Sequence, residues 1–231
     1  MIAGLQKMTL LDYPGKVACT VFLGGCNFRC PFCHNSQLLG AGAEKLMDEE
    51  QLLVFLKGRR GLLDAVCVSG GEPTLTPGLE ELLRSIKALG YSVKLDTNGS
   101  HPEVLKKLVQ QGLVDHVAMD VKNSPSRYAQ TVGLSQVDLT AIEESLRFLL
   151  EGSVPYELRT TVVLPLHNDG SIEEMGRWVG AIGKPPKWFL QKFTDRDTVI
   201  FSGLKAPDDS QLAAWRELLS PYAQHAAIRG E

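Results

Sequence analysis

The chain has 231 residues, of which 44% are apolar and 22% charged, and its net charge is −3 at pH 7. This length is enough to bury a substantial core, and the composition is that of an ordinary globular protein. The small acidic charge gives no basic surface for nucleic acid or for an anionic membrane, so neither is expected as a partner.

The N-terminus and the cysteines indicate a reducing compartment. Residues 1–7 lack the charged region and long apolar stretch of a secretory signal, and no segment approaches the length of a membrane span. The five cysteines are an odd number, and three of them lie within eight residues, which does not suit a disulfide framework. We therefore expect a cytoplasmic protein with reduced thiols.

Strands and helices alternate along the chain. Six strands are expected because these segments are apolar and rich in β-branched residues: 16–23, 65–69, 91–96, 116–121, 156–163 and 187–192. Cap residues and glycine stops predict a helix from 48 and further helices over 76–90, 101–111, 138–150, 171–182 and 210–222. Thr76 and Ser171 are expected to cap two of these helices.

The alternation predicts an α/β fold with parallel strands joined by right-handed helical crossovers. No linker or composition shift divides the chain, so we expect one domain over residues 1–231 with a core of about 16–193. A doubly wound sheet and a barrel both fit the pattern, but six units fall short of the eight in a closed barrel. A partial (β/α)6 barrel of the TIM type, open on one side, would leave a lateral cleft.

The segment 26–35 is the most unusual part of the sequence. Cys26, Cys30 and Cys33 follow the first strand directly, and thiolates hold soft metals and clusters. A structural zinc site would need a fourth ligand, either His34 or a distant cysteine. A four-iron cluster held by three thiolates would instead keep one iron open to another ligand. Cys19 and Cys67 lie inside strands and are interpreted as small buried hydrophobes.

Further polar residues follow the other strands, at the end where parallel α/β folds bind ligands. Each has a simpler explanation: a tight turn, a helix cap, or an ion pair between Asp120 and Lys122. Their joint placement favours a ligand site, because a glycine pair exposing backbone amides, an acid-rich strand end and an arginine suit a zwitterion. The segments are Gly70-Gly71-Glu72-Pro73, Asp96-Thr97-Asn98-Gly99 and Asp120-Val121-Lys122-Asn123, with Arg159 within the fifth strand and Gln191 at the sixth.

Cys-x3-Cys-x2-Cys after a first strand, followed one strand later by Gly-Gly-Glu-Pro, resembles the radical S-adenosylmethionine (SAM) superfamily. Asp12-Tyr13-Pro14-Gly15, Cys-Pro-Phe-Cys-His-Asn and the strand-end motifs at 96–99 and 120–122 resemble its glycyl-radical-enzyme activating group. Residues 4–16 are similar to activating proteins of anaerobic ribonucleoside-triphosphate reductase. The resemblance covers residues 4 to about 193.

The resemblance implies a role for each matching position. Cys26, Cys30 and Cys33 would ligate a [4Fe-4S] cluster whose fourth iron binds SAM. The SAM contacts would come from eight residues: Phe32 near the adenine, Gly70, Gly71 and Glu72 at the ammonium, Lys122 and Arg159 at the carboxylate or ribose side, and Asp96 and Gln191. Asp96, Thr97 and Asp120 would hold a monovalent cation. Gln191 stands where pyruvate formate-lyase activators carry a histidine, which leaves its role open.

The resemblance also implies an oxidoreductase that cleaves SAM reductively and makes a glycyl radical on a partner enzyme, with anaerobic ribonucleotide reductase expected as the partner. A reduced flavodoxin or ferredoxin-type protein would donate the electron. The segment between the cysteines and the second strand contains no further cysteine, so a single-cluster activase is expected. The alternatives are an activator of pyruvate formate-lyase or another glycyl-radical enzyme, a small-molecule radical SAM enzyme, and a structural zinc-binding module.

Overall fold

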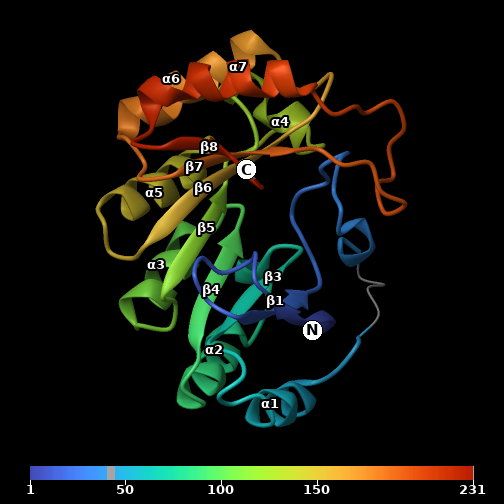
Figure 1. Cartoon of the computed structure of the whole chain (residues 1–231), viewed down its shortest axis with the longest axis vertical. Helices are drawn as coiled ribbons and strands as arrows, with labels where there is room; N and C mark the ends of the chain where they lie inside the picture. Colours follow the sequence, from blue (N-terminus) through green and yellow to red (C-terminus); the bar gives the residue numbers. More distant parts are fainter. Residues whose placement is uncertain (41–44, 231) are drawn as a thin grey trace. The chain divides into compact units, whose positions relative to one another are not determined.

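The structure, a computed structural model, describes residues 1–40 and 45–230 (Figure 1). The described chain divides into two compact units. The first contains Met1–Asn27, Gln37–Thr97 and Glu103–Ala118, and the second contains Phe28–Ser36, Asn98–Pro102 and the chain from Met119 onward. The expectation of one domain stays a prediction.

The first unit is built on a sheet with helices between its parallel strands. Its strands are β1 (Ile2–Thr9), β2 (Ala18–Leu23), β3 (Ala65–Gly70), β4 (Ser92–Thr97) and the start of β5 (His116–Asp120). Its helices are α1 (Glu49–Lys57), α2 (Leu79–Ala88) and α3 (Pro102–Gln110), with the short helix η2 (Pro73–Leu75) after β3. The first residue of α3, Pro102, is assigned to the second unit.

The strands β2, β3 and β4 are parallel and end at the same edge of the first unit's sheet. Leu23 lies opposite Gly70, and Val68 lies opposite Leu95, so the register brings the last residues of the three strands to one level. Their side chains are almost fully buried, as expected of strands covered on both faces. The loops that follow these strands therefore leave from one edge.

The second unit has the same alternation. Its strands are the end of β5, β6 (Tyr156–Val162), β7 (Trp188–Lys192) and β8 (Ala226–Ile228). Its helices are α4 (Tyr128–Thr131), α5 (Leu139–Leu150), α6 (Asp169–Ile182) and α7 (Asp209–Leu219), with the short helices η3 (Pro125–Arg127) and η4 (Ser220–Tyr222). β6 pairs with β7, and β7 with β8, in parallel.

The α/β fold with parallel strands is confirmed. All six expected strands are present as β2 to β7, with ends shifted by one or two residues. β1 is an edge strand in the first unit and β8 is one in the second, so the strand series is open, as expected. No helix in the described part of the chain is both long enough and apolar enough to cross a membrane.

Several details differ from the sequence expectations. β1, which pairs antiparallel with β2, and β8 were not expected, because β1 carries the exposed polar residues Gln6 and Lys7 and β8 has only three residues. Thr76 does not cap α2, which begins at Leu79 after a left-handed Gly78. Ser171 is not the cap of α6: Asn168 caps it, and Ser171 completes a reciprocal capping box as the third helical residue.

Candidate functional site

In the first unit, the loops after β2 and β3 run against each other. The amide of Gly71 donates to Leu23 O at 2.9 Å, and the amide of Glu72 donates to Gly25 O at 2.7 Å. The expectation that the glycine pair exposes its amides is therefore wrong for Gly71, because these amides continue the pairing between neighbouring strands. A role of the glycine carbonyls toward SAM stays a prediction.

Both glycines are required by this close approach. Gly70 has φ +120°, and a Cβ there would collide with the backbone of Leu23; a Cβ on Gly71 would collide with Gly25 O. The Gly70-Gly71 sequence therefore allows the β3 loop to lie directly beside the loop that leads into Cys26.

We expect Gly71→Ala to destabilise the protein by about 1–3 kcal/mol, because the new methyl group has to displace backbone. Urea unfolding measures the change. Gly58→Ala is the matched control, since Gly58 has φ −73° and its added Cβ would meet only ordinary contacts, 3.5 Å from Phe55 O at the nearest. An equal effect of the two substitutions would contradict the packing explanation.

Glu72 lies in a buried polar cluster at the end of β3. Glu72 is only 1% exposed. Its Oε1 accepts hydrogen bonds from Thr74 N at 3.1 Å, Thr74 Oγ1 at 2.5 Å and Thr97 Oγ1 at 2.8 Å. Hydrogen bonds to a carboxylate compensate for the loss of water around the charge. The carboxylate is thus held in one position at the strand end, as a ligand-binding group requires.

Asp96 is paired with a lysine that the sequence analysis did not select. Lys94 Nζ lies 2.5 Å from Asp96 Oδ1, and the Lys94 side chain is 0% exposed. Residues two apart on a strand share a face, so β4 itself brings the two groups together. The reasoning applied to Asp120 and Lys122, a charge pair two residues apart at a strand end, would have found Lys94 as well.

In the second unit, three charged residues meet where the end of β5 lies beside the middle of β6. Asp120 accepts from Lys122 Nζ at 2.8 Å through Oδ2 and from Arg159 Nε at 3.2 Å through Oδ1. The simple alternative, an Asp120–Lys122 ion pair, is thereby confirmed, and Arg159 does point at an anion. Burial alone would lower the pKa of Lys122, but the Asp120 carboxylate and the nearby Cys30 outweigh it and raise that pKa. Lys122 is an ammonium at physiological pH.

The register of β6 and β7 places Gln191 on the same face as Arg159. Thr161 lies opposite Gln191 and Arg159 opposite Phe189, and side chains of directly opposed residues share a face. The second unit therefore brings Asp120, Lys122, Arg159 and Gln191 to one face of its sheet.

Two buried residues hold the segment after β5: Asn123, which belongs to the expected strand-end segment, and His167, which the sequence analysis missed. His167 Nε2 lies 2.9 Å from Lys122 O, and burial lowers the pKa of its imidazole. Asn123 donates to Thr131 Oγ1 at 2.8 Å and to Leu166 O at 3.0 Å. Their polar atoms are buried and bonded, so they fix the backbone that carries Lys122.

The cysteine loop beyond Asn27 belongs to the second unit and is held at several points. Arg29 N donates to Val132 O at 2.8 Å, and Cys33 N donates to Cys30 O at 3.1 Å across a tight turn. His34 Nε2 lies 2.7 Å from Thr194 O and its ring stacks on Phe193, as expected of a loop-fixing residue. Phe32 is buried with Val163, Leu166 and Phe193; its contact with adenine stays a prediction.

The three candidate ligands Cys26, Cys30 and Cys33 are half-buried thiols without a disulfide. Cys26 belongs to the first unit, whereas Cys30 and Cys33 belong to the second. Over residues 1–40 and 45–230, no three or more His, Cys, Asp or Glu side chains are grouped closely enough to hold a metal ion. The convergence of the three thiols on one cluster therefore stays a prediction.

The other two cysteines differ in environment. Cys19 and Cys67 are fully buried in β2 and β3, and burial raises the pKa of each thiol to about 12. A thiol with such a pKa supplies almost no thiolate near neutral pH. This fits their interpretation as core residues.

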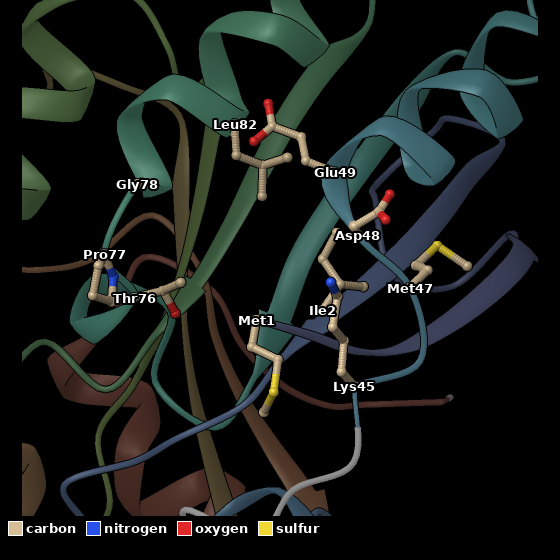
Figure 2. Close-up of a pocket in the computed structure, with 10 residues that line it drawn as sticks. All are labelled: Met1, Ile2, Lys45, Met47, Asp48, Glu49, Thr76, Pro77, Gly78 and Leu82. Atoms are coloured by element: carbon tan, nitrogen blue, oxygen red, sulfur yellow. The ribbon is translucent and has the colours of Figure 1, made fainter.

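The first unit also has a pocket of about 230 Å³ that is not lined by candidate site residues (Figure 2). It opens between the starts of α1 and α2 and the first residues of β1. Its lining residues include none of the candidate site residues: Met1, Ile2, Lys45, Met47, Asp48, Glu49, Thr76, Pro77, Gly78 and Leu82.

Comparison with known proteins identifies the family. The sequence pattern of the Radical SAM superfamily matches residues 20–179, which contain the cysteine loop and every strand end described above except Gln191 on β7. The chain belongs to the radical SAM superfamily. It is therefore an enzyme, and the alternative of a structural zinc module no longer applies.

Two relatives and one solved structure place this radical SAM chain more finely. A Methanocaldococcus jannaschii protein, provisionally named a glycyl-radical enzyme activating enzyme, is 30% identical over 99% of this chain and 95% of its own length. A Thermococcus kodakarensis protein, provisionally named GTP 3',8-cyclase, is 32% identical over 68% of this chain and 51% of its own length. The solved structure of Streptococcus suis SuiB bound to S-adenosylmethionine superposes on 90% of this chain and covers 51% of the SuiB chain, with a TM-score of 0.66. At 14% identity, this similarity shows a shared fold.

Radical SAM enzymes use a [4Fe-4S] cluster and SAM, and the donor set of this chain suits both. Three soft thiolates are one ligand short of a closed four-iron site, which leaves a position for SAM. The buried Glu72 carboxylate suits an ammonium, and the Lys122 ammonium suits a carboxylate. The monovalent cation expected at Asp96, Thr97 and Asp120 fits less well, since both carboxylates already contact basic side chains.

Proposed function

We propose that this radical SAM enzyme is a glycyl-radical-enzyme activating enzyme. The observation that carries the proposal is the similarity to the Methanocaldococcus jannaschii protein, which extends over 99% of this chain and 95% of that protein. The match thus includes the N-terminal strand, the cysteine loop and the C-terminal helix. The relative's provisional name describes an enzyme that activates a glycyl-radical enzyme.

The proposed roles follow from the chemistry of each group. Cys26, Cys30 and Cys33 hold the [4Fe-4S] cluster as thiolates. Glu72, fixed by Thr74 and Thr97, accepts from the SAM ammonium beside the carbonyls of Gly70 and Gly71. Lys122 and Arg159 face the SAM carboxylate or ribose side, and Phe32 and Gln191 complete the SAM site.

When bound, the cluster and SAM supply a 5′-deoxyadenosyl radical that takes a hydrogen atom from a glycine of the partner. The chain's own residues bind and orient SAM and keep water from the site. Loop anchors such as the His34–Thr194 and His167–Lys122 hydrogen bonds keep the binding groups in fixed positions. These contacts limit the motion of the cysteine loop and of Lys122.

Anaerobic ribonucleoside-triphosphate reductase is the proposed partner, because residues 4–16 are similar to its activating proteins. A reduced flavodoxin or ferredoxin-type protein is the proposed electron donor. Pyruvate formate-lyase is the alternative partner.

Electron paramagnetic resonance tests the proposal directly. The cluster-loaded protein is reduced anaerobically, mixed with SAM and either anaerobic ribonucleotide reductase or pyruvate formate-lyase, and a glycyl-radical signal is recorded. We expect a signal with the reductase and none with a reductase variant in which the radical glycine is alanine. SAM cleavage without a radical signal on either partner would contradict the activase function.

The similarity to a protein provisionally named GTP 3',8-cyclase supports a small-molecule enzyme as the second candidate. The match covers about half of that protein's length. Incubation of the reduced enzyme with SAM and GTP distinguishes the candidates: GTP-dependent formation of 5′-deoxyadenosine and a new nucleotide would favour the cyclase.

A further inference from the structure

The two carboxylates expected to bind a monovalent cation already have cationic neighbours within their own units. Lys94 Nζ lies 2.5 Å from Asp96 Oδ1 in the first unit. In the second unit, Lys122 Nζ lies 2.8 Å and Arg159 Nε 3.2 Å from the two Asp120 oxygens. A cation ligated by Asp96 would face the Lys94 charge at short range, and one ligated by Asp120 would face the charges of Lys122 and Arg159.

Lys94 decides whether a cation can bind at Asp96, because its buried position gives the ammonium little choice of partner other than Asp96. The side chain is 0% exposed, and Lys94 lies opposite Cys67 of β3, which lies opposite Thr20 of β2. Asp96 lies two residues after Lys94 on β4, so both side chains are on the same face of the strand. A buried ammonium is unfavourable without a counter-charge, so Lys94 depends on the Asp96 carboxylate.

The third expected ligand is also committed elsewhere. The Thr97 hydroxyl donates to Glu72 Oε1 at 2.8 Å. Neighbouring residues of a strand point to opposite faces, so the Thr97 side chain lies on the face away from Asp96. Its hydroxyl stabilises the Glu72 carboxylate and does not join Asp96 in a ligand set.

A nearby acid does not change this assignment. Asp12 lies close enough to Cys67 to raise its thiol pKa, as Asp96 does, but Asp12 Oδ2 already accepts from Thr20 Oγ1 at 2.6 Å. Around Cys67 there are thus one buried ammonium, that of Lys94, and two carboxylates, those of Asp96 and Asp12. Lys94 makes its short contact with Asp96.

We propose that Asp96, Thr97 and Asp120 of this chain do not form a monovalent-cation site, and that the Lys94 ammonium takes the place of the cation at Asp96. Lys94 is a positioning residue: it holds the Asp96 carboxylate near the end of β4, whose last residue, Thr97, hydrogen-bonds Glu72 from the other face. SAM binding to this enzyme is therefore independent of Na⁺ and K⁺.

Calorimetry tests the proposal on the anaerobically prepared, cluster-loaded enzyme. SAM is titrated in potassium, sodium and choline chloride at equal ionic strength, and the thermal unfolding midpoint without SAM is measured in the same salts. We expect the dissociation constant of SAM to agree within about twofold among the three salts. The midpoints should agree as well, because an ion that binds only the folded protein would raise them.

Lys94→Met provides the complementary result. Removing the ammonium leaves the Asp96 carboxylate without its buried partner, so SAM binding in choline chloride should weaken by about tenfold or more. Potassium or sodium should then restore part of the affinity. Lys87→Met is the matched control, because it removes a 2.7 Å ion pair with Asp115 in the same unit, neither residue is a candidate site residue, and the variant should show no dependence on the cation.

Wild-type enzyme that binds SAM at least about tenfold more tightly in potassium or sodium than in choline chloride would overturn the proposal. This measurement needs no variant, so it decides the question even if Lys94→Met does not fold. It also uses no partner protein, so its outcome is independent of the proposed activase function.

Discussion

Alanine at Cys26, Cys30 or Cys33 is expected to abolish reductive SAM cleavage, with a loss of more than about 100-fold. Replacement of residues that merely support metal ligands already costs about 10- to 100-fold, and these substitutions would remove a cluster ligand itself. Iron content and 5′-deoxyadenosine formation after anaerobic reconstitution measure the effect. Each variant should lose both cluster and activity.

Cys19→Ala and Cys67→Ala are the matched controls and should retain cluster and SAM cleavage. Both thiols are fully buried, and burial raises the pKa of each to about 12, so they remain protonated at neutral pH. Alkylation of the cluster-free protein at neutral pH should therefore spare these two thiols. Equal loss of activity in all five variants would show that the ligands are misassigned.

Glu72→Gln is expected to weaken SAM binding by about 10- to 100-fold. The substitution keeps the shape of the side chain and removes the charge that we propose for the SAM ammonium, and a hydrogen bond to a charged group is worth about 1.5–3 kcal/mol. Calorimetric titration of SAM into the cluster-loaded variant measures the affinity. Iron content should stay at the wild-type level, because Glu72 is not a cluster ligand.

Glu143→Gln is the control for this substitution. Glu143 also accepts a short hydrogen bond, from Trp178 Nε1 at 2.7 Å, but it lies on α5 of the second unit and is not a candidate site residue. SAM affinity should be unchanged in that variant. If Glu72→Gln bound SAM as tightly as wild type, the carboxylate would have only a structural role toward Thr74 and Thr97.

The sequence predicted the elements with strong local signals. β2 to β7 are apolar, β-branched runs, and such runs form buried strands almost irrespective of context. β1 and β8 were missed because β1 carries exposed polar residues and β8 has only three residues, so tertiary pairing decides both. The cap of α6 was misplaced for a similar reason: Asn168 and Ser171 are both good cap residues, and the backbone geometry selected Asn168.

For the candidate site, the sequence by itself determined the chemistry. Three cysteines at this spacing, Gly-Gly-Glu-Pro and the strand-end acids resemble the radical SAM superfamily, and the family match over residues 20–179 confirms the membership. Only the tertiary structure decided which partner each charge has. The counter-charge of a buried side chain comes from the neighbouring strand or from the next residue on the same face of its own strand. Sequence spacing alone does not reveal which charged side chains are buried. The fully buried Lys94 beside Asp96, and Thr97 bonded to Glu72 on the opposite face, are the two contacts on which we base the proposal of an internal ion pair in place of a cation site.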